Sequence, residues 1–399
     1  MLKNKAVILG SNFYISLSTI RSLGKENVHT VSMAFSDDGG YADKSKYCHE
    51  KHIIPHFRND TKNFIKYLID YAKKQDETPV LIPCHDSYLE VVDEYLDELK
   101  EYYHIPQTEK GLYTEIMDKG TLSKLAERKG VKIPETVHIG EDNFYEKIEN
   151  NIKYPCLVKP IDSPTFTAKF RKKLFKVYTK EELDEALKKA EDAEIEVIVQ
   201  RIIPGFDDHM YTFDAYLDQN AKVVHWATCQ KMRQFPINFG ASVYTIQRYV
   251  PELVEIGSRF LESINYKGFA EIEFKKDAET GEFYLIEINV RITNFNALLT
   301  KLGMNVPYIT YRDMIGNPLS PITFEKTTNR AFIHLLEDIY SIRGYLKTKQ
   351  LTVFQILKSY FRPKAYAIWS WTDIKPAIYF NINILKRVFN KLFRRPITK

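Results

Sequence analysis

Two stretches in which apolar and polar residues alternate, 268–277 and 285–291, place the strongest constraint on how this chain can fold. Alternation with a period of two is typical of a β-strand that buries one face. Thr280-Gly281-Glu282 lies between the two stretches and is typical of a hairpin turn. We therefore predict an antiparallel strand pair over 269–274 and 283–289, within a region of mixed α and β structure.

The polar face of this predicted hairpin carries oxygen ligands. Glu271 and Glu273 share one face of the first strand, and Glu287, Asn289 and Arg291 share one face of the second. Pairing can bring Glu273 opposite Glu287 and Asn289, a set of hard donors that suits Mg²⁺, while Arg291 could hold a phosphate. An exposed strand face that is merely charged fits the same alternation.

Other polar residues follow predicted strands earlier in the chain. Lys159 ends one strand, where it could reach a nucleotide phosphate or simply lie on the surface. Gln200 ends the next, and the turn 201–205 could offer backbone groups to an adenine. Asp207, or its neighbour Asp208, would then lie within reach of a ribose. The alternative for this segment is an ordinary turn at the end of a strand.

The first hundred residues alternate predicted strands, over 6–9, 28–33 and 79–83, with predicted helices, over 15–23, 61–74 and 87–100. This order implies a parallel sheet with helices on its faces. Ligands bind at the C-terminal ends of such strands, where residues 10–12 and 85–87 lie. Turns and helix caps explain the same residues equally well.

In their order and spacing these residues resemble the ATP-grasp superfamily, over roughly residues 1–320. The resemblance implies that the ATP phosphates are held by Lys119 and Lys159. It implies that adenine is held by Gln200 and the backbone near Ile203, and ribose by Asp207. Arg201 belongs to the same predicted nucleotide-binding set, although its position varies in the family.

The resemblance also gives the hairpin a role. It implies that Mg²⁺, with Mn²⁺ as an alternative, is bound by Glu273, Glu287 and Asn289, and that Arg291 steadies the transferred phosphoryl group. The role of Glu271 stays open. One departure from the family concerns the loop that covers the phosphates, which is often rich in glycine. Here residues 161–173, predicted as a polar and basic loop, contain no glycine.

Within the superfamily the chain looks like carboxylate–amine ligases of the D-aspartate ligase type, which share a basic, aromatic C-terminal extension. The segment 231–240 resembles one that lies near the phosphates and substrate in related ligases. This makes Arg233 the candidate for gripping a substrate carboxylate, with a solvated loop arginine as the alternative.

The expected fold class is α/β and α+β: an ATP-grasp fold with an N-terminal Rossmann-like parallel-sheet domain and a basic helical C-terminal extension. We expect the N-terminal domain over residues 1–108 and the ATP-grasp domain over 109–325, with a small lid subdomain at about 135–205. The extension covers residues 326–399.

The charge of the chain is concentrated in this extension. From Arg343 onward there are thirteen basic residues and one acid, Asp373, a net charge of +12, whereas the rest of the chain has a net charge of −7. Residues 382–395 predict an amphipathic helix, preceded by Trp369 and Trp371. These features suit an anionic membrane surface. Packing on the enzyme body is the second interpretation, and nucleic-acid binding is the least favoured.

The cysteines and apolar runs bear on where the protein works. The four cysteines are widely spaced and form no CxxC pair, which fits buried free thiols in a reducing compartment. The N-terminus lacks a signal-peptide pattern, and no apolar run is long enough to span a membrane. We expect a cytoplasmic protein, peripheral on the inner face of the cell membrane if the extension binds lipid.

The resemblance implies an ADP-forming ligase that uses ATP and Mg²⁺ to join a carboxylate to an amine through an acyl phosphate. The expected substrates are an amino acid or another small carboxylate and an amine acceptor on a cell-wall or surface-polymer precursor, which is lipid-linked in one version. Two alternatives stay open: a kinase or phosphotransferase, and a non-catalytic nucleotide-binding module docked at the membrane. A mere ATP sensor would not need Arg291 aligned with the metal ligands.

Overall fold

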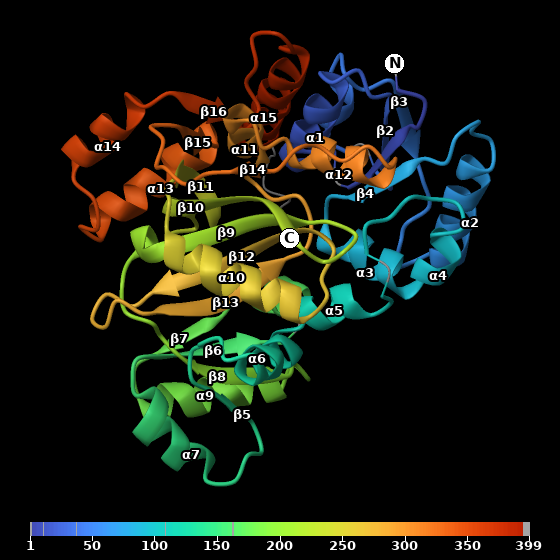
Figure 1. The fold of residues 1–399 in the computed structure, drawn as a ribbon. Coiled ribbons are helices and arrows are strands. Elements are labelled where there is room, and N and C mark those ends of the chain that lie inside the picture. Colours follow the sequence, from blue (N-terminus) through green and yellow to red (C-terminus); the bar gives the residue numbers. More distant parts are fainter. Residues whose placement is uncertain (1, 11, 37, 108, 162, 394–399) are drawn as a thin grey trace.

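The computed structural model describes residues 2–393 except for 11, 37, 108 and 162, and three sheets organise these residues (Figure 1). The first sheet is parallel, in the order β3-β2-β1-β4. Its strands are β1 (Ala6–Leu9), β2 (Thr30–Ala34), β3 (Glu50–Ile53) and β4 (Val80–Pro83). Its helices are α1 (Tyr14–Gly24), α2 (Thr61–Ala72), α3 (Asp86–Glu94) and α4 (Leu96–Leu99), with a 3₁₀ turn, η1 (Ala42–Lys44).

The predicted parallel sheet is confirmed, with two differences in detail. Strand β3 was not predicted, because its sequence Glu-Lys-His-Ile is mostly polar and its side chains are only half-buried or exposed. The helix predicted over 87–100 is two helices, because the chain leaves helical geometry at Tyr95.

A small antiparallel sheet, in the order β5-β8-β6-β7, forms the lower lobe in Figure 1. Its strands are β5 (Thr136–His138), β6 (Cys156–Pro160), β7 (Phe175–Val177) and β8 (Val197–Arg201). The helical segments of this lobe are α7 (Phe144–Lys147), η2 (Ile148–Ile152), α8 (Ser163–Phe170) and α9 (Lys180–Glu191).

The prediction of a loop over 161–173 is wrong, because α8 occupies most of that segment. Phe166 is fully buried and lies 4.7 Å from Phe170 and 5.0 Å from Phe175, ring centre to ring centre. Packing of these three rings against the small sheet gives the helix an apolar face. The polar and basic residues of the segment, which suggested a loop, lie among these rings in the sequence.

The third sheet has eight strands, in the order β13-β12-β9-β10-β11-β15-β16, with β14 paired to β10. The strands are β9 (Met210–Leu217), β10 (Val223–Phe235), β11 (Ala241–Gln247), β12 (Gly268–Lys276), β13 (Phe283–Asn289), β14 (Ile322–Thr323), β15 (Ala331–Ile333) and β16 (Lys364–Tyr366). Helix α10 (Pro251–Ser263) packs on β9 and β10. The remaining helices of this region are α5 (Leu112–Met117), α6 (Lys119–Arg128), α11 (Asn296–Leu302) and α12 (Val306–Met314).

The C-terminal extension is part of this core. Strands β15 and β16 continue the large sheet, and the extension adds α13 (Leu335–Lys347), α14 (Val353–Tyr360) and α15 (Lys375–Phe393). The helix predicted over 382–395 therefore begins earlier, at Lys375, and its residues 394 and 395 lie outside the described residues. These strands and α13 pack on the large sheet.

A buried ion pair fixes the extension to the N-terminal domain. Arg21 of α1 donates from Nε to Asp373 Oδ2 at 2.8 Å and from Nη1 to the Ile368 carbonyl at 2.8 Å. Asp373 also accepts from Ser45 Oγ at 2.7 Å and from the Lys46 amide at 2.9 Å. Asp373 is the one acidic residue after Arg343, so its charge is used for anchoring.

Candidate active site

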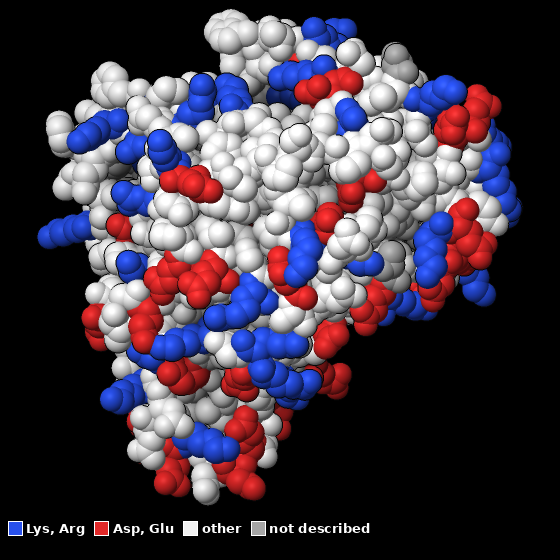
Figure 2. Space-filling view, in the orientation of Figure 1, with Lys and Arg blue, Asp and Glu red and all other residues white. Residues whose placement is uncertain are grey.

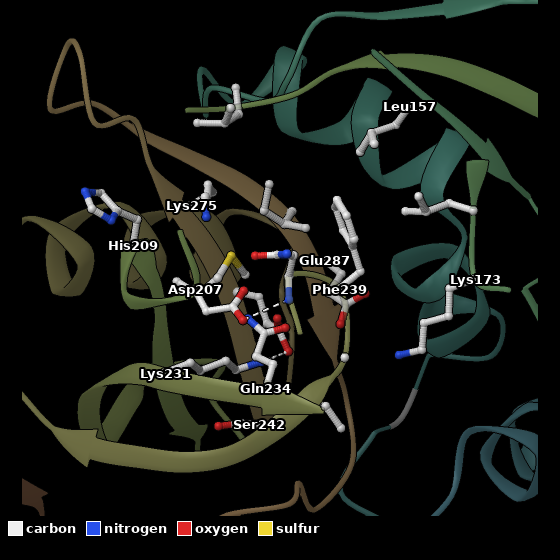
Figure 3. Close-up of a pocket in the computed structure, with 18 of the residues that line it drawn as sticks. Leu157, Lys173, Asp207, His209, Lys231, Gln234, Phe239, Ser242, Lys275 and Glu287 are labelled. Carbon is white, nitrogen blue, oxygen red and sulfur yellow. Dashed lines mark hydrogen bonds and ion pairs between the residues drawn. The ribbon is translucent and has the colours of Figure 1, made fainter. Parts of the chain in front are cut away.

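A cavity of about 1300 Å³ lies where the three sheets meet. Its lining includes every predicted nucleotide and metal residue: Lys119, Lys159, Gln200, Arg201, Ile203, Asp207, Glu273, Glu287, Asn289 and Arg291. His85 and Asp86, at the C-terminal end of β4, line it as well. Figure 3 shows Asp207, Lys231 and Glu287 around the cavity, with Lys173 extending toward it from the side of the small sheet. The predicted residues are therefore brought together in one place, with the exception of Arg233.

The predicted hairpin β12–β13 forms, and a register shift between Glu273 and Phe274 sets which of its polar residues face each other. Glu273 lies opposite Glu287, and Glu271 lies opposite Asn289. Asn289 Nδ2 donates to Glu271 Oε1 at 3.0 Å and to Glu273 Oε1 at 3.3 Å. Three carboxylates and one amide thus share a single buried face of the sheet.

A lysine that sequence reasoning did not assign lies against these carboxylates. Lys231 of β10 forms an ion pair with Glu273, and its side chain is only 6 % exposed. Burial raises the pKa of Glu273, and Lys231 opposes that effect. Burial acts on Glu287 in the same direction, but Lys231, Lys119, Lys159 and Lys173 together hold its pKa below the ordinary value. Glu287 is therefore an anion at neutral pH.

The donors on the hairpin fit Mg²⁺. Carboxylate and amide oxygens are its preferred protein ligands, and Glu271 Oε2 is a buried oxygen without a hydrogen-bond partner. Among the described residues, no group of three or more His, Cys, Asp or Glu side chains is arranged to hold a metal by itself. Mg²⁺ commonly binds through one or two carboxylates together with substrate phosphates and water. The face of the hairpin is suited to an ion that arrives with a nucleotide.

The two lysines predicted to bind phosphates, Lys119 and Lys159, line the cavity from α6 and β6. Lys159 Nζ donates to Gln200 Oε1 at 2.9 Å, and Gln200 Nε2 donates to Thr136 Oγ1 at 2.9 Å. Burial, followed by the nearby charge of Lys119, lowers the pKa of Lys159 to about 8. The amide of Gln200 is thus engaged on both sides, and the apolar side chains of Leu157 and Ile286 line the cavity as well. Apolar walls of this kind suit a flat base.

Of the two candidate aspartates, Asp207 is the one that lines this cavity. Asp207 Oδ2 accepts a hydrogen bond from the Asn238 amide at 2.9 Å and a second one from the Tyr345 hydroxyl. Tyr345 also accepts from the Gln234 amide at 2.7 Å, and its side chain is fully buried. A residue of α13 in the C-terminal extension therefore fixes the predicted ribose ligand.

Arg201 spans two lobes at the edge of the cavity. It forms ion pairs with Glu135 of the small lobe and with Asp277 at the end of β12, both at 3.2 Å. Its guanidinium is therefore engaged by protein carboxylates, and Arg201 can hold the small lobe against the hairpin.

Arg291 is positioned by the N-terminal domain. Its Nε and Nη2 donate to the two oxygens of Asp86 at 2.6 and 2.9 Å. Asp86 begins α3, whose N-cap His85 accepts from the Ser87 amide at 3.2 Å. The segment 85–87 is thus a helix cap and also a wall of the cavity, so the helix-cap and ligand-binding interpretations of this segment are compatible.

The proposed role of Arg233 in gripping a substrate carboxylate does not agree with the structure. Arg233 is 2 % exposed and does not line the cavity. Its Nε and Nη2 donate to both oxygens of Asp338 at 2.6 and 2.9 Å, and its guanidinium lies 4.1 Å from the ring centre of Tyr244. Irregular pairing on both sides of Arg233 interrupts the regular alternation of β10 there. Asp338 is 105 residues away in sequence, so nothing near Arg233 indicates this pair.

The family of the carbamoyl-phosphate synthase L chain, ATP binding domain, matches residues 118–320, about half of the chain. D-aspartate ligase of Enterococcus faecium is 29 % identical over 279 residues, which cover 66 % of this chain and 66 % of that protein. D-alanine--D-alanine ligase of Carboxydothermus hydrogenoformans is 25 % identical over 241 residues, which cover 56 % of this chain and 74 % of that protein.

Solved structures share the fold. The biotin carboxylase domain of 2-oxoglutarate carboxylase from Hydrogenobacter thermophilus, in complex with MgADP and bicarbonate, superposes with a TM-score of 0.65. The match covers 83 % of this chain and 74 % of that one, at 17 % identity. Together with the family match over half of the chain, this establishes that the chain belongs to the ATP-grasp superfamily; the two curated relatives that it matches are ligases.

Proposed function

We propose that this protein joins the carboxylate of an amino acid to an amine acceptor, at the expense of ATP, by way of an acyl phosphate. The observation that carries the proposal is the single face of the β12–β13 hairpin on which Glu273, Glu287 and Asn289 lie, with Arg291 just beyond the end of β13 in the same cavity. That face meets Lys119 and Lys159 across one cavity. Carboxylates for a metal, cations for phosphates and an arginine beyond them are what phosphoryl transfer to a carboxylate requires.

The residues divide into a nucleotide end and a transfer end. At the nucleotide end, Lys119 and Lys159 would bind phosphates, the turn around Ile203 with Gln200 would receive adenine, and Asp207 would bind ribose. At the transfer end, Glu273, Glu287 and Asn289 would hold Mg²⁺, which lowers the cost of moving negative charge onto ADP. Arg291, fixed by Asp86, would hold the transferred phosphoryl group.

The reaction balances without a covalent enzyme intermediate. A carboxylate oxygen of the amino acid attacks the γ-phosphorus, the bond to ADP breaks, and an acyl phosphate forms. The amine then attacks the carbonyl carbon and loses a proton, and inorganic phosphate leaves with the original carboxylate oxygen. The protein supplies position and electrostatic stabilisation.

The substrates proposed are an amino acid and the amine of a cell-wall or surface-polymer precursor. D-aspartate ligase and D-alanine--D-alanine ligase among the relatives support an amino-acid substrate. A lipid-linked acceptor would place the reaction on the inner face of the cell membrane. Within the described ranges every helix is too short or too polar to cross a bilayer.

The experiment that tests the function offers the purified chain ATP, Mg²⁺ and a panel of D- and L-amino acids, with and without a lipid-linked peptidoglycan precursor. Release of phosphate that requires both an amino acid and the acceptor is the expected result. ADP formed with one substrate and no amine would identify a kinase instead. Binding of ATP without turnover of any pair would favour a non-catalytic module.

We expect the affinity for ATP to fall as the pH rises through about 8. Lys159 is charged below its pKa of about 8 and becomes neutral above it, so the free enzyme loses a phosphate-binding cation. KM for ATP should therefore rise between pH 7.5 and 9. Lys159→Arg, which stays charged, should remove this dependence. Lys275→Arg is the matched control, since burial also lowers the pKa of Lys275 to about 8. If Lys275→Arg removes the pH dependence of KM and Lys159→Arg does not, the titrating group is Lys275.

We expect Tyr345→Phe to raise KM for ATP about tenfold with little change in kcat. The substitution removes a hydrogen bond to a buried carboxylate, worth about 1.5–3 kcal/mol, and frees Asp207 to move. Calorimetry with ADP provides an independent check. Tyr340→Phe, an exposed tyrosine on the same helix, should have no effect. Equal affinity for ADP in wild type and Tyr345→Phe would contradict the assignment of Asp207 as the ribose ligand.

A further inference from the structure

Exposed apolar side chains are concentrated in the C-terminal extension. Of the 26 large hydrophobic residues exposed in the described part of the chain, 18 lie between Leu335 and Phe389. The most exposed are Phe361 at 88 %, Trp371 at 83 % and Phe354 at 74 %. Monomeric proteins rarely expose so many large apolar groups in one region without a binding role.

Helix α15 is amphipathic in the folded protein. One face of α15 lies against the enzyme body. On it, Ala377 is buried, and the ring centre of Phe380 lies 5.4 Å from that of Tyr41. Asn383 donates a hydrogen bond to the Gly39 carbonyl at 2.9 Å. The outward face carries Ile378, Ile382 and Leu385, with Val388 beside them, all more than 40 % exposed. Spacings of four and three residues place these on one stripe.

Helix α14 exposes a second apolar surface. Val353, Phe354 and Leu357 are 59 %, 74 % and 57 % exposed, while Ile356 is the residue of this helix that packs inward. In Figure 1, α14 and α15 both project from the upper part of the molecule, away from the small lobe. Figure 2 shows that region as a largely white surface with scattered blue and little red.

The charge around these apolar surfaces has one sign. From Arg343 to Asn390 the chain contains nine basic residues, among them Lys358 on α14 and Lys386 and Arg387 on α15. Asp373 is the single acid in that span, and it is buried against Arg21. The surface of the extension after Arg343 therefore presents no exposed carboxylate in the described residues. Such a surface complements an anionic one.

We infer that α14, Trp371 and the outward face of α15 form a docking surface for an anionic lipid bilayer. Apolar and aromatic side chains would enter the interface between headgroups and acyl chains, while the basic residues meet lipid phosphates. A protein partner would not require a surface with one sign of charge, and a nucleic acid would not require so many exposed aliphatic side chains. The pattern is therefore best matched by lipid.

The docking surface is rigidly tied to the site. Asp373 joins the start of α15 to Arg21, and β16 holds the chain between α14 and Trp371 in the large sheet. On the inner side of α15, the ring centre of Phe380 lies 6.2 Å from that of His334. The ring centre of His334 lies 5.0 Å from that of Tyr14 in α1. Docking would thus fix the orientation of the cavity relative to the bilayer, which would serve an enzyme with a lipid-linked acceptor. The use of docking to present a lipid-linked acceptor rests on the proposed function, whereas the binding of lipid does not.

The test is flotation of the full chain with vesicles of phosphatidylglycerol and phosphatidylethanolamine, compared with vesicles of phosphatidylcholine. We expect the wild type to float with the anionic vesicles, not with the neutral ones, and to be released by high salt. The double variant Phe354→Glu/Leu385→Glu should reduce the bound fraction at least about tenfold, because it removes apolar burial and adds repulsion. Both side chains are exposed, so its thermal unfolding should match wild type.

Matched controls come from exposed isoleucines elsewhere. Ile53→Glu and Ile139→Glu alter side chains that are 58 % and 53 % exposed in the N-terminal domain and the small lobe, and should bind vesicles normally. Equal flotation of the double variant and wild type would overturn the inference. So would absence of anionic vesicle binding, a dimer in sedimentation that the double variant dissociates, or RNA binding that the vesicles do not displace. Vesicle binding does not depend on turnover, so failure of the ligase activity would leave the docking result standing.

Discussion

Replacing Glu287 with glutamine is expected to lower ATP turnover by at least about 10³-fold, a loss of roughly 4 kcal/mol of transition-state stabilisation. Glu287 is half-buried, and Lys231, Lys119 and Lys159 hold its pKa below the ordinary value, so it would offer a full negative charge to Mg²⁺. Glutamine keeps the shape and one oxygen donor but removes that charge. The loss should appear in kcat, measured as ADP release at saturating ATP, and should be only partly relieved by raising Mg²⁺.

A matched control lies on the same hairpin. Glu282→Gln changes an exposed glutamate that pairs with Lys132 at the turn, and it should leave kcat unchanged. Thermal unfolding separates chemistry from folding: Glu287→Gln removes a charge that nearby lysines stabilise, so it should lower the stability of the fold modestly, while the variant stays folded at the assay temperature. Normal turnover by Glu287→Gln would exclude the hairpin as the metal site.

Replacing Asp373 with alanine is expected to destabilise the protein by about 3–5 kcal/mol, because it leaves the Arg21 guanidinium buried without its counter-charge. The Ser45 hydroxyl and the Lys46 amide lose their acceptor as well. The midpoint of thermal unfolding should fall by roughly 5 °C or more. Protease cleavage between Arg362 and Lys375 should become faster, because this ion pair holds the extension on α1.

An exposed ion pair provides the comparison. Asp97→Ala removes a partner of Lys100 on the surface and should change stability by less than about 0.5 kcal/mol. Arg21→Leu/Asp373→Leu removes both charges and should recover much of the loss, as neutral pairs often do at buried positions. Equal stability of Asp373→Ala and wild type would mean that the other contacts of the extension, among them β15, β16 and the Arg233–Asp338 pair, are enough to hold it.

The parts of the fold that sequence could predict are those with a local pattern. The parallel sheet follows from strand–helix alternation, and the hairpin follows from period-two alternation on both sides of a turn. The register shift between Glu273 and Phe274, which places Glu273 opposite Glu287, has no such pattern in the sequence, whereas the sheet and the hairpin have local signals. These signals need only neighbouring residues.

The parts that could not be predicted depend on residues distant in sequence. Arg233 lies away from the cavity because it pairs with Asp338 and stacks on the ring of Tyr244. Tyr345 donates a hydrogen bond to Asp207, which is 138 residues away in sequence. Helix α8 forms because its phenylalanines pack together with Phe175, which a count of polar residues does not reveal. Lys231 had one local signal, a lysine within a mostly apolar strand, but its partner lies on another strand.

The extension shows the same limit at the level of domains. Its composition separates it from the rest of the chain at about residue 343, yet β15 and β16 complete a sheet that begins with the β12–β13 hairpin. The composition of the extension predicts only its outer surface, which is basic and apolar. It does not report the inner surface, where Asp338, Tyr345 and Asp373 hold the enzyme together.

The measurement that tests the central claim most directly is transfer of ¹⁸O from the carboxylate of the amino-acid substrate to inorganic phosphate, followed by mass spectrometry. Formation of an acyl phosphate and attack of the amine on its carbonyl carbon predict one ¹⁸O atom in each phosphate released. Phosphate that carries oxygen from water, or label that stays entirely in the amino acid, would contradict ligation through an acyl phosphate.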